Sequence, residues 1–545
     1  MRRYLLLAAI PMAMMAAGSF TACSGGDDNG TGDAGDANAP DVKKLPEAGL
    51  DGQAEAAPPV TPAGTQLAAS DGIQIFGVTT DGQVIYADLI SGGLFAVSET
   101  GGTPTQIASP SGYVLGIAGK IVFVWSGVSS TDVGTLNLWQ MGGTYHQVAV
   151  KSDPNAGFAS SLDGNHIIFS VNANTAGTLG GFVGANADGS DQVLLVNNVD
   201  ISSTSSCRPE IGFANNTTAV SATCAVDPGD GGVPSATVTA YAIGAAGDGG
   251  TSWTNTDVIT GALNFWSTDT AGDKLMVATP SEVSVYTAIT SVPVGIPIDA
   301  KDIENGQNGT WTFGRMQATG SNVLYSTAAG DLYISSATVP APATLQASGV
   351  KFVRAISPDE HYMVYSSNFD SIPFGSDLFL TKATDPAGSP ETFVTGTTGA
   401  LFGAYGVDAF TADSSYAIWI ENLDTTHGIG DLYAGTVAGG TPVQIATGVW
   451  QNTSATGTKV VYNNNCGDCN ATATGGFGHG DIYSVDVATN QPKLLQTQAD
   501  IPLTAGNSLP LSTTKDHVIY SYSLNTQSSG TPAPGGNGLY AVAIQ

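Results

Sequence analysis

The sequence predicts an all-β fold, a β-propeller of about eight to ten four-stranded blades. Charged residues make up only 11% of the chain, while Gly (70) and Pro (27) are frequent, which favours short strands and tight turns over long surface helices. From residue 63 onward one four-strand unit recurs, and a landmark residue in its third strand returns every 44 to 57 residues. The landmarks are Leu94, Leu138, Phe182, Val238, Val283, Leu332, Leu378, Leu432, Ile482 and Leu539.

The clearest copy of the unit covers residues 357–394. A Ser-Pro-Asp-Glu turn at 357–360 precedes an apolar strand at 361–366, a third strand begins with Asp377-Leu378-Phe379, and a short strand at 391–394 closes the unit. Short strands at this spacing, separated by turn residues, are typical of propeller blades.

A closed ring requires the two ends of the folded chain to meet. The last unit reaches Gln545 before a closing strand, whereas residues 64–69 read like the closing strand at 440–446. We therefore expect residues 64–69 to pair with 539–544 and remove an open sheet edge. The alternative is two smaller propellers divided near residue 300.

The repeats resemble the WD40-like (PD40) β-propeller repeats of the TolB type. The residues that carry the resemblance are Ser357-Pro358-Asp359, Tyr365-Ser366 and Asp377-Leu378-Phe379. It is close over 316–545 and looser over 64–315, and it implies a type of repeat rather than a particular activity.

The N-terminus reads as an export signal. Arg2 and Arg3 precede an apolar stretch and small residues that end before Cys23, which resembles a bacterial lipoprotein signal over residues 1–22, with Phe20 where Leu is usual. The resemblance implies cleavage before Cys23, a diacylglyceryl group on its sulfur, an acyl chain such as palmitate on its amino group and, because Ser24 follows, the outer membrane. An ordinary signal peptide is the alternative. Residues 23–62 are expected to be a disordered Gly/Asp/Pro tether, and 63–545 the propeller.

The charge balance excludes one class of partner. With 16 basic and 46 acidic residues the net charge is −30, and no basic stripe offsets it, so nucleic acid is not expected as a partner. The partners expected are the membrane, through the lipid on Cys23, and a protein or glycan of the cell envelope.

The other cysteines indicate disulfides rather than a metal. Cys207 and Cys224 lie 17 residues apart and can pair in an oxidising compartment. Cys466 and Cys469 form a C-x-x-C motif with no second ligand pair nearby, so a local disulfide is favoured over zinc or redox chemistry. No metal or cofactor is expected.

One face of the predicted propeller is the candidate binding surface. The connections between second and third strands are long in the last four units, at 367–376, 421–430, 464–480 and 522–537, and equivalent loops share one face. Their candidate residues are Phe369, Asp370, Phe374, Asp424, His427, Phe477 and His479. Both histidines are expected to be exposed loop residues rather than metal ligands.

No catalytic motif stands out in the chain. Gly-x-Ser-x-Gly, His-Glu-x-x-His and Walker patterns are absent from the sequence. The function predicted is therefore a non-catalytic, lipid-anchored propeller that binds an envelope protein or glycan. The alternative is an envelope propeller enzyme, a polysaccharide lyase or glycoside hydrolase, whose titratable groups would converge in a pocket.

Overall fold

The computed structural model describes one compact unit, Pro62–Gln545. The residues left out of the description are 1–61, 110–112, 129–132, 175–178, 202–208, 225–235, 247–249, 263–265, 280–281, 288–293, 297–313, 328–329, 340–341, 351, 367–369, 372–373, 376–377, 383–390, 395–409, 425–428, 451–452, 467–476, 503–508 and 523–535. The expectations for the signal peptide, Cys23 and the tether therefore lie outside the described residues. Within the described part of the chain, no helix is long and apolar enough to cross a membrane.

The described strands form consecutive antiparallel sheets, which we number as blades in chain order. Blades 1 to 4 are β2 (Ile73–Val78), β3 (Gln83–Asp88), β4 (Gly93–Ser98), β5 (Thr105–Ala108); β6 (Tyr113–Ala118), β7 (Ile121–Ser126), β8 (Gly134–Trp139), β9 (His146–Ser152); β10 (Phe158–Ser160), β11 (His166–Val171), β12 (Leu179–Asn186), β13 (Val193–Asp200); and β14 (Glu210–Asn215), β15 (Thr218–Cys224), β16 (Ala236–Ala245), β17 (Thr251–Ala262). Blades 5 to 7 are β18 (Trp266–Thr268), β19 (Lys274–Thr279), β20 (Glu282–Thr287), β21 (Val294–Ile296); β22 (Gly314–Met316), β23 (Asn322–Ser326), β24 (Leu332–Ser336), β25 (Thr344–Ala347); and β26 (Phe352–Ile356), β27 (Tyr362–Ser366), β30 (Leu378–Lys382), β31 (Glu391–Val394).

The remaining strands complete the ring. Blade 8 is β32 (Tyr416–Asp424), β33 (Ile429–Thr436) and β34 (Val443–Trp450); blade 9 is β35 (Thr453–Thr456), β36 (Lys459–Asn464), β37 (Phe477–Asp486) and β38 (Gln491–Pro502); and blade 10 is β39 (His517–Tyr522), β40 (Gly538–Ala543) and β1 (Thr65–Ala69). A small hairpin, β28 (Asp370–Ser371) and β29 (Phe374–Gly375), lies in the chain between β27 and β30, and a 3-10 turn, η2 (Pro154–Ala156), precedes β10.

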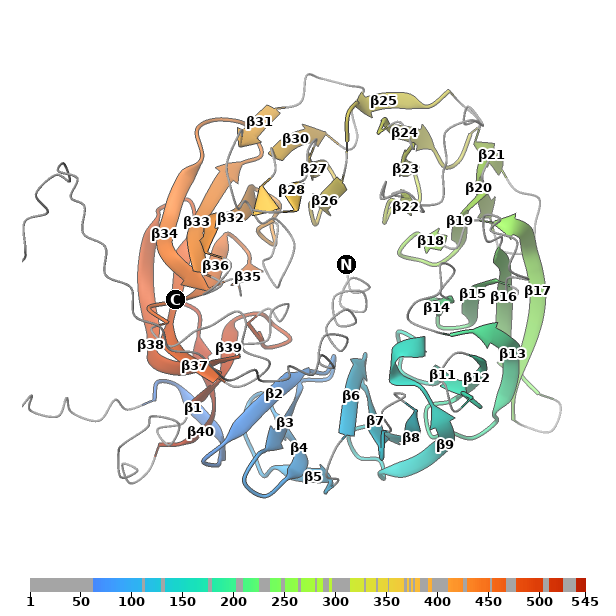
Figure 1. Cartoon of the computed structure of the whole chain (residues 1–545), viewed down its shortest axis with the longest axis horizontal. Helices are drawn as coiled ribbons and strands as arrows, with labels where there is room; N and C mark the ends of the chain where they lie inside the picture. Colours follow the sequence, from blue (N-terminus) through green and yellow to red (C-terminus); the bar gives the residue numbers. More distant parts are fainter. Residues whose placement is uncertain are drawn as a thin grey trace, which may run out of the picture. The chain divides into compact units, whose positions relative to one another are not determined.

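Seven of the sheets, blades 1 to 7, have four strands. Blade 8 has three strands and an isolated bridge from Phe410 to Ala417 at its inner edge. Blades 9 and 10 form one seven-stranded sheet, joined only through the pair Asp500–Ser521. The repeat that the sequence predicts is thus a propeller of four-stranded blades, with ten sheet units in the described chain (Figure 1).

The core lies between the blades. Each of the apolar clusters is shared by two consecutive blades, as in the group around Phe123 and Phe169 between blades 2 and 3. One cluster joins Met276 of blade 5 to Met316 of blade 6 across residue 300, and another joins Ile519 of blade 10 to Val84 of blade 1. The alternative of two rings divided near residue 300 is therefore wrong, because packing continues through that point and returns to the start.

Strand β1 closes the ring as predicted. It pairs antiparallel with β40, with Thr65 opposite Ala541 and Ala69 opposite Gly538. Just before β1, the backbone N–H of Ala63 donates to Gln496 Oε1 (2.6 Å) and its carbonyl accepts from the Tyr520 hydroxyl (2.6 Å). The start of the propeller is thus fixed to two blades by side chains as well as by sheet pairing.

The sequence landmarks all fall in the third strand of a blade, from Leu94 in β4 to Leu539 in β40, when the isolated bridges at Phe410 and Leu511 are counted as the first strands of blades 8 and 10. Beside them, aromatic residues on the second and third strands stack directly across the ladder in several blades. Tyr325 and Tyr333, for example, have ring centroids 5.6 Å apart and an interplanar angle of 19°. The Tyr-Ser and Leu-Tyr patterns of the repeat therefore encode cross-strand aromatic pairs that fill the space between blades.

The turns between first and second strands, at the end of the ring that we call the lower face, link each blade to the next. In blade 7, the Ser357 hydroxyl donates to Asp359 Oδ1 (2.5 Å), which also accepts from the N–H of His361 (3.0 Å). Asp359 N–H donates onward to Ser414 Oγ of blade 8 (2.9 Å). The Ser-Pro-Asp sequence therefore forms a hydrogen-bonded turn, and the N–H of Asp359, which the turn itself does not use, bonds to the neighbouring blade.

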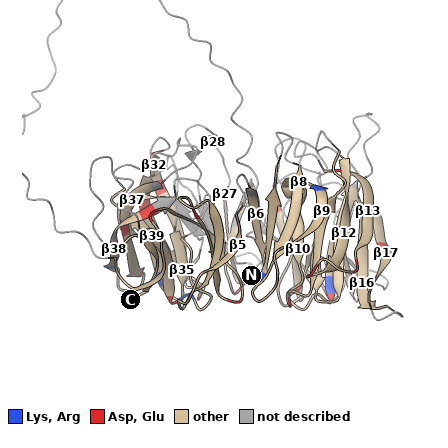
Figure 2. Ribbon diagram, turned by 90° about the horizontal axis from the view of Figure 1, so that it is seen from below, with Lys and Arg blue, Asp and Glu red and all other residues tan. Residues whose placement is uncertain are grey.

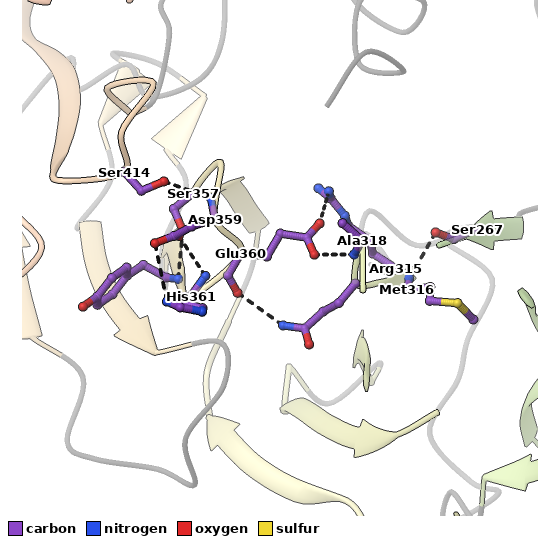
Figure 3. A network of polar contacts seen from close by, with 11 residues as sticks. Ser267, Arg315, Met316, Ala318, Ser357, Asp359, Glu360, His361 and Ser414 are labelled. Atoms are coloured by element: carbon purple, nitrogen blue, oxygen red, sulfur yellow. Dashed lines mark hydrogen bonds and ion pairs between the residues drawn. The ribbon is translucent and has the colours of Figure 1, made fainter. Parts of the chain in front are cut away.

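Glu360 links blade 7 to the preceding blade, blade 6. Its carboxylate accepts from Arg315 Nη2 (2.5 Å) and from the backbone N–H of Ala318, both in blade 6 (Figure 3). Glu360 has a φ of 61°, where three of the corresponding turns contain Gly82, Gly164 and Gly320 and two others contain Ser414 and Lys515. A side chain is thus kept in the left-handed region, where it costs about 1 kcal/mol or more, at a position from which it reaches the previous blade.

Candidate functional site

The opposite end of the blades, where second and third strands are connected, is the upper face, and strands extend into two of its expected loops. Residues 421–424 belong to β32 and 429–430 to β33, while 477–480 belong to β37. Asn422 has a φ of 52° at a register shift between Glu421 and Asp424. A bulge at a residue that tolerates positive φ lets the ladder continue through Asn-rich sequence that reads as a loop.

Of the seven candidate binding residues, the structure describes the side chains of only two, Asp424 and His479. Phe369 and His427 lie outside the described residues, and only the backbones of Asp370 (β28), Phe374 (β29) and Phe477 (β37) are described. Asp424 is the exposed last residue of β32. The expectation that His479 is an exposed loop residue is wrong: it lies in strand β37, with only 9% of its side chain exposed, because the pairing of β37 with β38 continues past it.

His479 lies opposite Asp500 on β38. Its Nε2 is 3.6 Å from Asp500 Oδ1, and the Asp500 side chain is 3% exposed. That distance is longer than a hydrogen bond. Burial raises the pKa of the nearby Tyr522, and the negative charge of Asp500 raises it further. The His479–Asp500 pair thus lies within blade 9, and Asp500 links it to blade 10 by pairing with Ser521.

Blade 8 presents two carboxylates side by side. Glu421 on β32 is directly opposite Asp431 on β33, and both side chains are partly exposed. Glu421 Oε1 accepts from the indole N–H of Trp419 (2.7 Å), and Asp431 Oδ2 accepts from the amide of Asn422 (2.9 Å). Like charges in directly opposed positions of a sheet are destabilising, so this arrangement has an energetic cost that the rest of blade 8 must offset.

Blade 9 repeats the arrangement with one charge fewer. Asp481 is opposite Asn464, a neutral residue, and its two oxygens accept from the amide of Asn465 (2.8 Å) and from the N–H of Gln498 (3.1 Å). We call Glu421, Asp424, Asp431, Asp481 and Asp500 together the acidic rim. Figure 2 shows acidic positions on the ribbons labelled β32 and β37, at one end of the ring.

Of the acidic rim, sequence reasoning selected only Asp424. A signal for two others was present, since Asp431 and Asp481 stand directly before the landmarks Leu432 and Ile482 of the aligned repeat. What the repeat could not supply is the register that places Glu421 opposite Asp431.

The cysteine predictions are mostly untested. Cys466 is disulfide-bonded, whereas Cys469 lies outside the described residues, so their pairing stays a prediction. Cys207 is also outside the described residues, and Cys224 is placed only by its backbone at the end of β15. In the part of the chain that the structure describes, no three His, Cys, Asp or Glu side chains are grouped so as to hold a metal ion.

Comparison with known proteins identifies no family for this chain. No family model matches the chain, and no curated protein matches it either, so the resemblance to TolB-type repeats and to lipoproteins stays a prediction. Among solved structures, the chain is similar to the β-propeller domain of the Trilobed protease from Pyrococcus furiosus, with 11% identity over 70% of this chain and 98% of that one (TM-score 0.28).

Two further structures have similarly low scores. One is a eukaryotic initiation factor, with 11% identity over 70% of this chain and 89% of that one (TM-score 0.43). The other is Porphyromonas gingivalis dipeptidyl peptidase 4, with 10% identity over 80% of this chain and 60% of that one (TM-score 0.38). The activities of these proteins carry no weight for this chain, whose propeller architecture follows from its sheet order and inter-blade packing.

Proposed function

We propose that the protein is a non-catalytic binding module of the cell envelope, and that the upper ends of blades 8 and 9 contact a partner protein. The observation that supports this most directly is the acidic rim. Two neighbouring blades extend their strands beyond the landmark positions and carry partly exposed carboxylates there. Polar side chains held on rigid strands are suited to recognition, because little conformational freedom is lost when they bind.

The chemistry of the rim favours binding over catalysis. Glu421 and Asp431 each accept a hydrogen bond from a neighbouring side chain and lie on an open strand surface. The one buried His–carboxylate pair of the rim, His479–Asp500, has atoms 3.6 Å apart, too far for the hydrogen bond that a base and its orienting group share. A glycan is the second class of partner that the sequence predicts, and the experiment below distinguishes it.

The test is capture followed by mapping. The full-length protein would be immobilised and exposed to envelope extract, with and without prior glycosidase treatment of the extract, and retained proteins would be cross-linked to it. The proposal expects a retained protein whose cross-links map to blades 8 and 9 and survive glycosidase treatment. Cross-links confined to the lower-face turns or the outer strands would refute the assignment of the surface. Loss of all retention after glycosidase treatment would indicate a glycan instead.

We also propose that the protein is anchored in the outer membrane through a lipid on Cys23. The support is the order of features in the sequence, a basic start, an apolar stretch and small residues before that cysteine. Incorporation of labelled palmitate by the wild type and not by Cys23→Ser, together with release of Cys23→Ser from the membrane fraction, is the expected result. Equal membrane association of both proteins would contradict it.

A further inference from the structure

The side of blade 8 that faces blade 7 carries an unusual set of groups at its upper end. Directly paired residues of an antiparallel ladder point to the same side of the sheet, and alternate residues of a strand do so too. Tyr433, Asp431 and Ile429 of β33 therefore share one side, together with the residues opposite them in β32 and β34. We call this the blade 8 cluster: Trp419, Glu421, Asp424, Asp431, Tyr433 and Trp450.

Among the residues that the structure describes, the two carboxylates at its centre have no counter-ion. Glu421 and Asp431 each make one hydrogen bond to a neutral donor, and among the described residues no Lys, Arg or His forms an ion pair with either. In the second- and third-strand ladders that the structure describes, this is the one place where two acids are directly opposed. A positive group bound between them would remove the repulsion.

An aromatic surface lies beside the carboxylates. Trp419 and Tyr433 stack with ring centroids 6.2 Å apart and an interplanar angle of 14°. Burial raises the pKa of Tyr433, and the charges of Glu421 and Asp431 raise it further, so both carboxylates lie within electrostatic range of the Tyr433 hydroxyl. Carboxylates beside a partly exposed aromatic ring suit a guanidinium or ammonium group, which can pair with the acids and contact the ring face.

A second, independent observation indicates that the ligand is more than a bare cation. Trp450 lies in the next cross-strand row, with Ile429 and Asp424. Its side chain is completely buried, and its indole N–H has no hydrogen-bond partner in the described part of the chain. A buried donor without an acceptor is unfavourable, and a ligand that brings an oxygen acceptor to this row would satisfy it. A metal ion or a polyamine has no acceptor to offer, whereas a peptide has one in every residue.

From this arrangement we infer that the blade 8 cluster binds an Arg- or Lys-bearing segment of a partner protein. The cationic side chain lies between Glu421 and Asp431 against Tyr433, and a peptide carbonyl accepts from Trp450. This inference rests on the proposed function and specifies the chemistry of the partner. It also explains why the chain keeps two opposed acids, although a single Glu421→Gln change would remove the repulsion between them.

The experiment measures binding and stability on the same variants. The probes are two fluorescein-labelled nonapeptides of Gly and Ser that differ only at the central residue, Arg or Gln, and binding to the full-length protein is followed by anisotropy. Glu421→Gln and Asp431→Asn keep the acceptors for Trp419 and Asn422 but remove one charge each. Asp88→Asn is the control, because this acid lies at the corresponding end of β3 in blade 1, opposite Gly93 and outside the acidic rim.

The charge-removing variants are expected to lose affinity for the Arg peptide without losing stability. The Arg peptide binds at least tenfold more tightly than the Gln peptide, and Glu421→Gln or Asp431→Asn removes that preference. The same variants keep or raise the thermal midpoint, since a repulsion has been relieved. Trp450→Phe weakens binding of both peptides several-fold, and Asp88→Asn leaves binding unchanged.

Equal affinity for the Arg and Gln peptides, or an unchanged preference in Glu421→Gln, overturns the inference. Displacement of the Arg peptide by millimolar calcium chloride or spermine would also overturn it, by showing a site for cations alone. The failure is separable from that of the proposed function. If the wild type and Glu421→Gln retain the same protein from envelope extract, only this site is wrong, whereas no retention by the wild type refutes the binding function itself.

Discussion

Replacement of Glu360 by glycine tests how the turns of the lower face hold the blades together. The carboxylate receives Arg315 Nη2 at 2.5 Å and the N–H of Ala318, with side-chain exposures of 8% for Glu360 and 18% for Arg315. Hydrogen bonds to a charged group contribute about 1.5–3 kcal/mol each, so the loss of two costs about 3–6 kcal/mol before relaxation and water replace part of it. Glycine returns about 1 kcal/mol by relieving the φ of 61°.

Glu360→Gly is therefore expected to destabilise the protein by about 2–4 kcal/mol, and Glu360→Ala by about 1 kcal/mol more, because alanine keeps the backbone strain and loses the same contacts. Urea unfolding followed by both fluorescence and circular dichroism measures this, with coincident transitions as the condition for comparing free energies. A double-mutant cycle with Arg315→Met isolates the ion pair. A Glu360→Gly protein as stable as the wild type would show that strain outweighs the link between blades 6 and 7, and the reasoning would be wrong.

Three further outcomes follow from the same structure. Gly64→Ala should loosen the closing strand, because Gly64 has a φ of 87° and a Cβ there would lie 2.1 Å from the carbonyl oxygen of Ala541. Amide hydrogen exchange at residues 65–69 and 538–543 should become faster, and unchanged exchange would contradict this prediction. Burial raises the pKa of Tyr86, Tyr365 and Tyr462 to about 12, so stability present below pH 10 should be lost as the pH approaches 12, and absorbance at 295 nm should report these tyrosines ionising together with unfolding rather than near 10. Burial tends to raise the pKa of Asp413, but hydrogen bonds from the Thr411 and Ser415 hydroxyls and from the Ser415 N–H lower it overall. The contribution of Asp413 to folding stability is therefore present above about pH 4 and lost below it. Asp413→Asn should flatten the acid limb of the curve of stability against pH, and an unchanged limb would contradict this.

The repeat could be predicted from sequence because its signals are local. A landmark such as Leu432 sits between an acid and an aromatic residue, and the structure places it, fully buried, in a third strand. The pairing of residues 64–69 with the last strand was also predictable, because the last repeat lacks its closing strand and residues 64–69 resemble the closing strand of another repeat. Both features depend on patterns of a few residues that recur in register.

The strand ends of blades 8 and 9 could not be predicted in the same way. Asn422 and Gln498 have φ values of 52° and 53° at register shifts, so polar sequence that ordinarily forms a loop stays in the ladder. The single-residue offset at each bulge decides which side chains face one another. His479 becomes a buried neighbour of Asp500 for this reason, although its Gly-rich surroundings suggest an exposed loop.

The acidic pair of blade 8 shows how a repeat fold can carry a specific site. Successive blades share one backbone plan, so the row after the stacked aromatics exists in blade 8 as Glu421 opposite Asp431 and in blade 9 as Asn464 opposite Asp481. The ladder is equally well formed in both, which means that its geometry does not require the second charge. A charge that the fold does not need, placed where it destabilises the sheet, is better explained by binding than by stability, because local consistency is given up mainly at functional positions.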